Sequence, residues 1–295
     1  MPNQVLVAIS RDPLPEKLIF SLKDQALQYG IVLHSIGGQV SNGTYYSERF
    51  ESSAHIEIAH REQLRALATS FNADLCFLKA ELVPQDIRVL AMDMDSTLIN
   101  IECIDEIADF TGKKSAVAGI TEATMRGEIK DFQESLRRRV ALLEGVHADA
   151  LESVYRERLR PNPGAAELLT GAHERGIYTL LVSGGFTFFT EKLRQQLSFK
   201  QTQANTLEII DGKLTGRVLG DIVDGAAKAA HLDAACTRLG CTKANAITMG
   251  DGANDLIMMN GSGISVAYQA KPVVKEKADA AFDRVGLDAA LLLIS

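Results

Sequence analysis

The chain has 295 residues, of which 46% are hydrophobic and 23% are charged, and its net charge is −7. This composition is typical of a soluble globular protein with one large domain or two ordinary ones. The negative charge argues against a nucleic-acid binder, which usually carries a basic face. It also means that a phosphate-bearing substrate must be attracted by local positive charge.

The N-terminus and the cysteines give no sign of export. Residues 1–4 place no basic segment ahead of an apolar core, and no apolar run is long enough to span a bilayer. Cysteine occurs at four positions, Cys76, Cys103, Cys236 and Cys241. Their spacing is not that of zinc ligands, and we expect buried free thiols. We therefore expect a cytoplasmic protein without a membrane or nucleic-acid partner.

Residues 1–84 have the pattern of a small α+β domain. Strands are expected at 5–9, 31–36, 54–59 and 75–78, and helices at 15–29 and 61–71. We interpret Gly37 and Gly38 as the end of the second strand, and the alternating residues 54–59 as a half-buried strand. The order strand–helix–strand–strand–helix–strand predicts a ferredoxin-like fold. Residues 84–86 are the expected linker to a second domain, residues 85–295.

In that second domain, apolar strands alternate with helical segments. The strands expected at 89–95, 178–183 and 246–251 each end in polar residues. This alternation predicts an α/β fold with a Rossmann-like three-layer core.

Two insertions interrupt the alternation. Residues 101–160 are mostly helical and too long for one crossover helix, so we expect a helical cap there. Residues 207–210 and 214–218, joined through Asp211 and Gly212, are the expected arms of a hairpin.

The strand at residues 89–95 ends in two aspartates one residue apart. Side chains alternate along a strand, so Asp93 and Asp95 point the same way and their carboxylates repel each other. A hard cation such as Mg²⁺ would relieve this repulsion, because it prefers oxygen ligands. Asp251 and Asp255 follow a third strand, and the carboxyl ends of such strands meet at one edge of the sheet. Either cluster alone could be a polar turn, but together they favour a metal site.

These carboxylates suit phosphoryl transfer. Asp93 is the candidate nucleophile, and Asp95 the candidate acid that later activates water as a base. Asp93 and Asp251 would bind Mg²⁺, together with the backbone carbonyl of Asp95. Asp255 could orient these metal ligands by contacting them without binding the metal itself.

Donors for the phosphoryl oxygens follow the second strand and begin a later helix. Ser183 and Gly184 could present a hydroxyl and backbone N–H groups, although a glycine-rich turn explains them equally well. Lys228 lies in the first turn of the helix expected at residues 225–239, where the helix end adds positive charge. Without the aspartates, a solvated surface lysine would be the better interpretation.

Arg139 gives an independent signal. In the helix expected at residues 131–143, one stripe is apolar and consists of Phe132, Leu136 and Leu143. Arg139 lies near the centre of that stripe and should face a buried anion, because an unpaired buried charge is costly. An intramolecular salt bridge is the alternative. Position alone predicts that Glu102 is solvated.

Taken together, these motifs resemble the phosphatases of the haloacid dehalogenase-like superfamily, and among them the group that hydrolyses the phosphate ester of serine. The resemblance covers about residues 88–285, and the residues that carry it are 93–102, Met125, 132–139, 183–186, Lys228 and 250–255. The aspartate motifs indicate only the superfamily. The continuation Asp-Ser-Thr-Leu-Ile-Asn-x-Glu and the run Phe-x-x-Ser-Leu-Arg-x-Arg are far more specific.

The resemblance implies Mg²⁺-dependent hydrolysis of O-phosphoserine through an aspartyl-phosphate, the last step of serine biosynthesis. It makes Asp93 the nucleophile and Asp95 the general acid and base, and it assigns Mg²⁺ to Asp93, Asp95 and Asp251. It also implies a substrate site made of Glu102, Met125, Phe132, Arg139, Ser183, Gly184, Lys228 and Asn254. Within this site, Arg139 would bind the α-carboxylate and Glu102 the α-ammonium.

The N-terminal unit resembles an ACT-type regulatory domain in its element order. An amino-acid effector site there, a homodimer contact and a purely structural role all stay open.

Other functions fit the sequence less well. A phosphomutase of the same superfamily would need a hydroxyl-rich ligand site, which Arg139 and Glu102 do not suit. A related phosphatase for another small ester is a closer alternative. A haloalkanoate dehalogenase would need neither Asp95 nor Mg²⁺, and an amino-acid sensor with an inert phosphatase-like domain would not need the intact catalytic aspartates.

Overall fold

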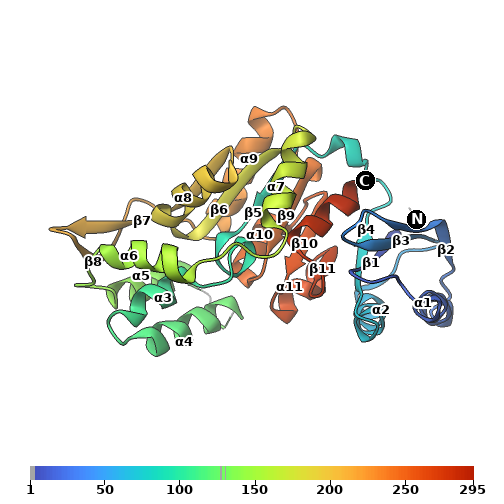
Figure 1. The fold of residues 1–295 in the computed structure, drawn as a ribbon, viewed down its shortest axis with the longest axis horizontal. Coiled ribbons are helices and arrows are strands. Elements are labelled where there is room, and N and C mark those ends of the chain that lie inside the picture. Colours follow the sequence, from blue (N-terminus) through green and yellow to red (C-terminus); the bar gives the residue numbers. More distant parts are fainter. Residues whose placement is uncertain (1–3, 127, 130) are drawn as a thin grey trace.

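The computed structural model describes residues 4–126, 128–129 and 131–295, and it contains two sheets (Figure 1). The smaller is antiparallel, in the order β2-β3-β1-β4. Its elements are β1 (Val5–Ser10), α1 (Glu16–Gln28), β2 (Leu33–Ser41), β3 (Tyr46–Ser52), α2 (Ile58–Ser70) and β4 (Asp74–Leu78). Leu6 and Ala8 of β1 pack with α1 and α2, while Val7 and Ile9 face the larger unit.

Two details of this sheet differ from the sequence prediction. The strand predicted at residues 54–59 is wrong, because these residues form a loop and the start of α2. Ile56 is buried but Ile58 is half exposed, so the alternation of residue types is not an alternation of burial. The real third strand, β3, consists mainly of polar residues, yet it is paired on both sides. Strand β2 continues through Gly37 and Gly38, whose positive φ angles accompany a register shift.

The larger sheet has the order β11-β10-β9-β5-β6-β7-β8 and is parallel except for the β7–β8 hairpin. Its strands are β5 (Val89–Met92), β6 (Tyr178–Phe186), β7 (Gln201–Ile210), β8 (Lys213–Leu219), β9 (Ala246–Gly250), β10 (Ile264–Tyr268) and β11 (Ala280–Phe282). Strand β5 is central and buried on both faces, which explains its uninterrupted apolar run.

Helices cover both faces of this sheet. They are α7 (Ala165–Glu174), α8 (Thr187–Leu197), α9 (Gly225–Arg238), α10 (Leu256–Met259) and α11 (Pro272–Lys277). Val89 and Ala91 share a core cluster with α9, whereas Leu90 and Met92 share one with α7 and α8. The predicted three-layer α/β core is confirmed.

The cap leaves the core after β5 and returns before α7. It contains α3 (Cys103–Asp109), α4 (Lys114–Met125), α5 (Phe132–Ala141) and α6 (Asp149–Ser153). Its two connections lie side by side, because Ile99 bridges Pro161 and the side-chain amide of Asn162 donates to the carbonyl oxygens of Thr97 and Ile99. The cap therefore stands over the carboxyl ends of β5 and β6 (Figure 1).

The two sheets belong to units that share one apolar core cluster, to which the small sheet contributes Val7, Ile9, Cys76 and Leu78. Asp74 adds polar contacts, since its Oδ2 accepts hydrogen bonds from three consecutive backbone N–H groups at residues 283–285.

The cysteines match the sequence prediction in part. Three of the four cysteines are buried free thiols, as expected, but Cys241 is only half buried. Among the described residues, no helix combines the length and apolar character needed to cross a bilayer.

Candidate active site

A sharp turn after β5 places the first aspartate pair. Asp93 accepts a hydrogen bond from the Met94 N–H at 2.7 Å through its own Oδ1, and its N–H is held by the Met249 carbonyl of β9. Ser96 then adopts a left-handed conformation with φ of 55°. This turn brings the chain back, so that Oδ1 of Asp95 accepts from the N–H of Cys103 at 3.2 Å, at the start of α3. Both carboxylates are buried at the edge between core and cap.

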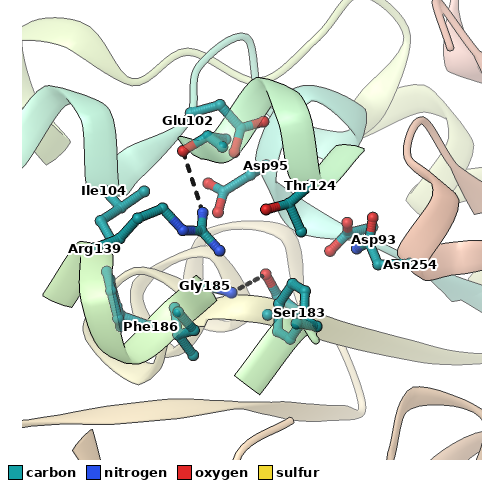
Figure 2. Close-up of a pocket in the computed structure, with 14 residues that line it drawn as sticks. Asp93, Asp95, Glu102, Ile104, Thr124, Arg139, Ser183, Gly185, Phe186 and Asn254 are labelled. Atoms are coloured by element: carbon teal, nitrogen blue, oxygen red, sulfur yellow. Dashed lines mark hydrogen bonds between the residues drawn. The ribbon is translucent and has the colours of Figure 1, made fainter. Parts of the chain in front are cut away.

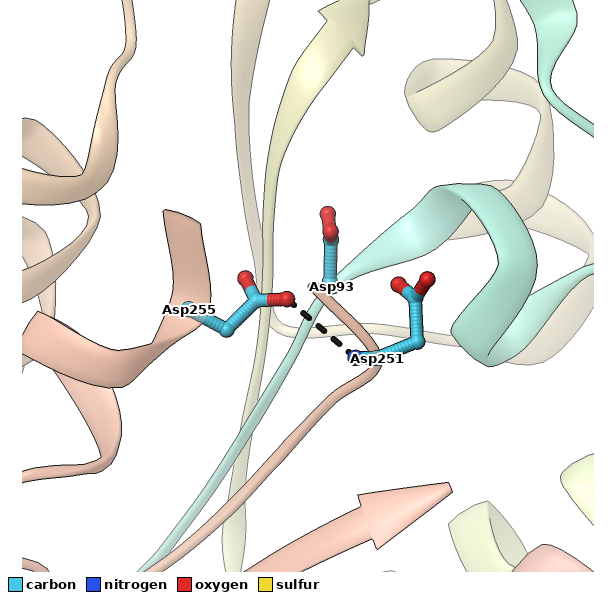
Figure 3. A group of neighbouring side chains, drawn as sticks. All are labelled: Asp93, Asp251 and Asp255. Atoms are coloured by element: carbon cyan, nitrogen blue, oxygen red, sulfur yellow. Dashed lines mark hydrogen bonds between the residues drawn. The ribbon is translucent and has the colours of Figure 1, made fainter. Parts of the chain in front are cut away.

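Three buried carboxylates converge beside this turn. Oxygen atoms of Asp93, Asp251 and Asp255 lie within 4.8 Å of one another (Figure 3). The hydroxyl of Thr97 donates to Oδ1 of Asp251 at 3.2 Å. Oδ2 of Asp255 accepts from the N–H groups of Asp251 and Gly252, so Asp255 fixes the loop that carries Asp251.

Burial and mutual repulsion disfavour the charged forms of these acids. Burial, followed by the nearby charge of Asp255, raises the pKa of Asp251 well above its usual range. Burial and the charge of Asp93 raise the pKa of Asp255 to about 6 and that of Asp95 to about 7. A set of hard oxygen donors that repel one another this strongly fits a divalent cation.

Lys228 is a buried cation beside the nucleophile candidate. Its Nζ lies 2.8 Å from Oδ2 of Asp93 and 2.7 Å from Oδ1 of Asp255, and its side chain is fully buried. Burial alone would lower the pKa of Lys228, but Asp255 and Asp93 outweigh that effect and raise it. The side chain of Asp224 caps α9 by accepting from the Ala227 N–H, which orients the helix turn that carries Lys228.

A cavity between core and cap joins most of the predicted site residues (Figure 2). The predicted residues that line it are Asp93, Asp95, Glu102, Phe132, Arg139, Ser183, Gly184 and Asn254. Lys228 and Asp251 do not line the cavity but lie next to Asp93, which does. The side chain of Met125, which was also predicted to belong to the site, lies outside the described part of the chain.

Arg139 extends from α5 into the cavity and is only 5% exposed. Its Nε donates to the carbonyl oxygen of Ser135 at 3.4 Å, and its Nη1 to Oγ1 of Thr121 at 3.2 Å. The guanidinium lies over the ring of Phe132. Burial lowers the pKa of Arg139, while the charges of Glu102, Asp105 and Asp95 act against that shift. Among the described residues, no carboxylate forms a salt bridge with it, so a buried cation faces the cavity without an ionic partner.

Glu102 corrects the prediction made from position alone. That prediction placed Glu102 in solvent, whereas the structure places it half buried in the cavity lining. Glu102 precedes α3 and has extended backbone angles, so a helical face does not describe its direction. Its Oε1 accepts a hydrogen bond from the hydroxyl of Ser96. Burial, followed by the charge of Asp95, raises the pKa of Glu102 well above its usual range.

The end of β6 requires small residues. A Cβ atom at Gly184 would lie 2.7 Å from Cζ of Phe132, and one at Gly185 would lie 2.6 Å from Oδ2 of Asp95. Glycine therefore lets the cap and the aspartate turn approach the backbone of this loop closely. The hydroxyl oxygen of Ser183 accepts from the Gly185 N–H at 2.9 Å.

Three residues that position parts of the candidate site were not predicted from the sequence. Asn205, buried in β7, donates to the Gly184 carbonyl at 2.8 Å and accepts from the Val223 N–H at 2.9 Å. Thr97 supports Asp251, and Thr121 contacts Arg139. Thr97 lies inside the aspartate motif and could have been weighed there. Nothing in the local pattern marks Asn205 or Thr121.

Comparisons with known proteins identify the family of this chain. The model of the haloacid dehalogenase-like hydrolase family matches residues 90–260. A phosphoserine phosphatase from Polaromonas sp. is 55% identical over 218 residues, which cover 72% of this chain and 92% of that protein.

Two solved structures are also similar to this chain. A HAD family hydrolase from Salmonella enterica serovar Typhi has a TM-score of 0.84 at 28% identity, over 99% of this chain and 98% of that one. A phospho-aspartyl intermediate analogue of a phosphoserine phosphatase has a TM-score of 0.67 at 36% identity, over 70% of this chain and 99% of that one.

Proposed function

The chain belongs to the haloacid dehalogenase-like hydrolases, and we propose that it is a phosphoserine phosphatase that hydrolyses O-phosphoserine to serine and phosphate. The observation that carries the substrate assignment is Arg139, a buried guanidinium without an ionic partner among the described residues, in the same cavity as the two catalytic aspartates. A substrate with a carboxylate beside its phosphate ester would supply the missing anion.

The first half of the reaction uses the pair at the end of β5. A carboxylate oxygen of Asp93 attacks phosphorus, and the bond between phosphorus and the serine oxygen breaks. Asp95 gives its proton to that departing oxygen. Its pKa of about 7 keeps a substantial protonated fraction near neutral pH, because burial and the charge of Asp93 disfavour the carboxylate. Serine leaves, and Asp93 carries the phosphoryl group.

The second half returns the enzyme to its starting state. Asp95, now ionised, takes a proton from a water molecule as the water oxygen attacks phosphorus. The bond between phosphorus and the Asp93 oxygen breaks, and phosphate leaves. Lys228, Ser183 and the backbone around Gly184 would hold the phosphoryl oxygens, together with Asn254, and Lys228 offsets negative charge next to the nucleophile.

The buried carboxylates fit Mg²⁺. We propose that Asp93 and Asp251 bind it, with Asp95 contributing its backbone carbonyl and Asp255 fixing the Asp251 loop. The ion would supply positive charge that neutralises the phosphate during transfer.

The remaining assignments concern the substrate and the setting. Glu102 would pair with the substrate α-ammonium, and Phe132 with Met125 would shield the site from the cap side. We propose a cytoplasmic enzyme of serine biosynthesis. Residues 1–84 would be an ACT-like domain that is regulatory or forms a homodimer contact, with an amino-acid effector as a candidate ligand.

A substrate panel tests the proposal. Phosphate release is measured with phosphoserine, phosphothreonine, sugar phosphates and p-nitrophenyl phosphate, with Mg²⁺ and with a chelator. Strong preference for phosphoserine that the chelator abolishes is the expected result. Turnover without that preference would keep the aspartyl-phosphate chemistry but refute the substrate assignment.

A further inference from the structure

Arg139 is held by a contact from a neighbouring cap helix. Its Nη1 lies 3.2 Å from Oγ1 of Thr121 in α4. The same hydroxyl lies 2.9 Å from Oδ1 of Asp105 in α3 and 3.1 Å from the carbonyl oxygen of Val117. A hydroxyl can accept from the guanidinium while it donates its single proton to one of these oxygens. Three cap helices therefore meet at the Thr121 hydroxyl.

This arrangement leaves Arg139 available for a ligand. Thr121 is 3% exposed, so water does not replace its contact easily. Asp105 is the acid behind Thr121, but it forms no salt bridge with Arg139 and instead contacts it through the hydroxyl. Nη2 of Arg139 donates no hydrogen bond to any residue in the described ranges. A direct Asp105–Arg139 ion pair would compete with an incoming carboxylate, whereas the intervening hydroxyl orients the guanidinium and leaves its charge unpaired.

We propose that Thr121 and Asp105 are positioning residues for Arg139, which set the orientation in which the guanidinium receives the substrate carboxylate. This inference rests on the proposed function, because it assumes a phosphate ester with a carboxylate. Asp105 supports the contact electrostatically, since Arg139 and Asp105 attract each other across Thr121. If Thr121 and Asp105 position Arg139, their mutation should weaken binding of substrates that carry a carboxylate and spare phosphate esters that lack one.

The test compares two substrates that differ only in the carboxylate, phosphoserine and phosphoethanolamine. In Thr121→Val, we expect KM for phosphoserine to rise about tenfold, the scale of one hydrogen bond to a charged group. KM for phosphoethanolamine and kcat for both substrates should change little. Thr121→Ser keeps the hydroxyl and should restore most of the affinity. Thr111→Val is the matched control, because Thr111 is also in the cap and, within the described ranges, its hydroxyl bonds only the Ala108 carbonyl.

The outcomes separate this inference from the proposed function. If the wild-type protein shows no preference for phosphoserine over phosphoethanolamine, the proposed function fails first. If the wild type has that preference, an equal loss on both substrates, or a Thr121→Ser variant as impaired as Thr121→Val, overturns the positioning role. Asp105→Asn leaves Thr121 in place, so it still tests the inference if Thr121→Val fails to fold. A smaller rise in KM for phosphoserine alone is expected, and an unchanged KM would overturn the role of Asp105.

Discussion

The ammonium nitrogen of Lys228 lies 2.8 Å from Oδ2 of Asp93, and both side chains are buried. This ion pair fixes one oxygen of the candidate nucleophile, while the Met94 N–H fixes the other. Lys228 also pairs with Asp255, so it does not depend on Asp93 alone for a counter-charge. The nucleophile can therefore be neutralised by mutation without leaving a buried lysine unpaired.

Asp93→Asn should abolish turnover while the protein stays folded. We expect a loss of at least about a thousandfold, because an amide oxygen is a poor nucleophile for phosphorus. Steady-state phosphate release measures the loss, and circular dichroism verifies the fold. Turnover within about tenfold of wild type would remove Asp93 as the nucleophile.

Mg²⁺ should stabilise the fold as well as support turnover. A cation between Asp93 and Asp251 relieves their repulsion, so the thermal unfolding midpoint should rise with Mg²⁺ concentration and fall again with a chelator. In Asp251→Asn this rise should shrink or vanish. Asp211→Asn is the control, because Asp211 lies in the exposed β7–β8 turn, where asparagine tolerates the positive φ. Equal rises in both variants would place the ion elsewhere.

Arg139→Ala should remove the preference for phosphoserine over phosphoethanolamine. We expect KM for phosphoserine to rise about 10- to 100-fold, because a charge-assisted contact to the carboxylate is lost. KM for phosphoethanolamine should change little. Arg138→Ala serves as the control, since Arg138 is exposed and, among the residues described, pairs only with Glu134 on the same helix. Equal losses on both esters would mean that Arg139 is structural or acts on the phosphate.

The buried Asp74 predicts a pH dependence of stability. Burial raises its pKa to about 6, and three backbone N–H groups act against that rise. The folded state therefore holds the Asp74 proton more tightly than the unfolded state. The stability from this proton is present below pH 4 and is lost as pH rises through 6. The shift of about two pKa units corresponds to about 3 kcal/mol.

Asp74→Asn isolates this contribution, because the amide oxygen can accept the same hydrogen bonds but cannot ionise. Free energies of unfolding at pH 4 and pH 7.5 are compared for variant and wild type. The variant should gain stability relative to wild type as pH rises. A constant difference would show that Asp74 titrates normally in the folded protein.

The position of the candidate site was predictable because its signals are local. Asp93, Asp95 and Asp251 each follow a buried apolar strand, and parallel strands bring such ends to one edge. Arg139 was predictable for the same reason, since one stripe of a helix is defined by spacing alone. The structure buries Arg139 and leaves Arg137 exposed, as the spacing indicates.

The errors arose where tertiary contacts decide the outcome. Strand β3 looks polar, but pairing on both sides and contacts such as Ser35 with Glu48 satisfy its side chains. Glu102 lies just outside a helix, so no periodicity applies to it. Thr121 acquires its contact with Arg139 only when α4 packs beside α5. No pattern within one segment encodes these relationships.

Removal of residues 1–83 should preserve turnover but lower stability. Every predicted site residue lies between residues 93 and 255, so the chemistry does not need the small sheet. The Polaromonas phosphoserine phosphatase is matched over 92% of its own length but over only 72% of this chain. However, Val7, Ile9, Cys76 and Leu78 pack into the core of the larger unit, and their loss exposes apolar surface.

We therefore expect the shortened protein to keep kcat within about threefold while its thermal unfolding midpoint falls by roughly 5–10 °C. The control is full-length Tyr45→Phe, which loses only the hydroxyl contacts with Asp288 and the Gly286 N–H and should show a smaller shift. A folded, soluble shortened protein without turnover would mean that the small sheet acts on the site. One structural route for such an effect runs through α11, because Arg65 of α2 donates to the Lys275 carbonyl. Just before α11, the Lys271 N–H donates to the Asp251 carbonyl and its Nζ pairs with Glu122 of the cap.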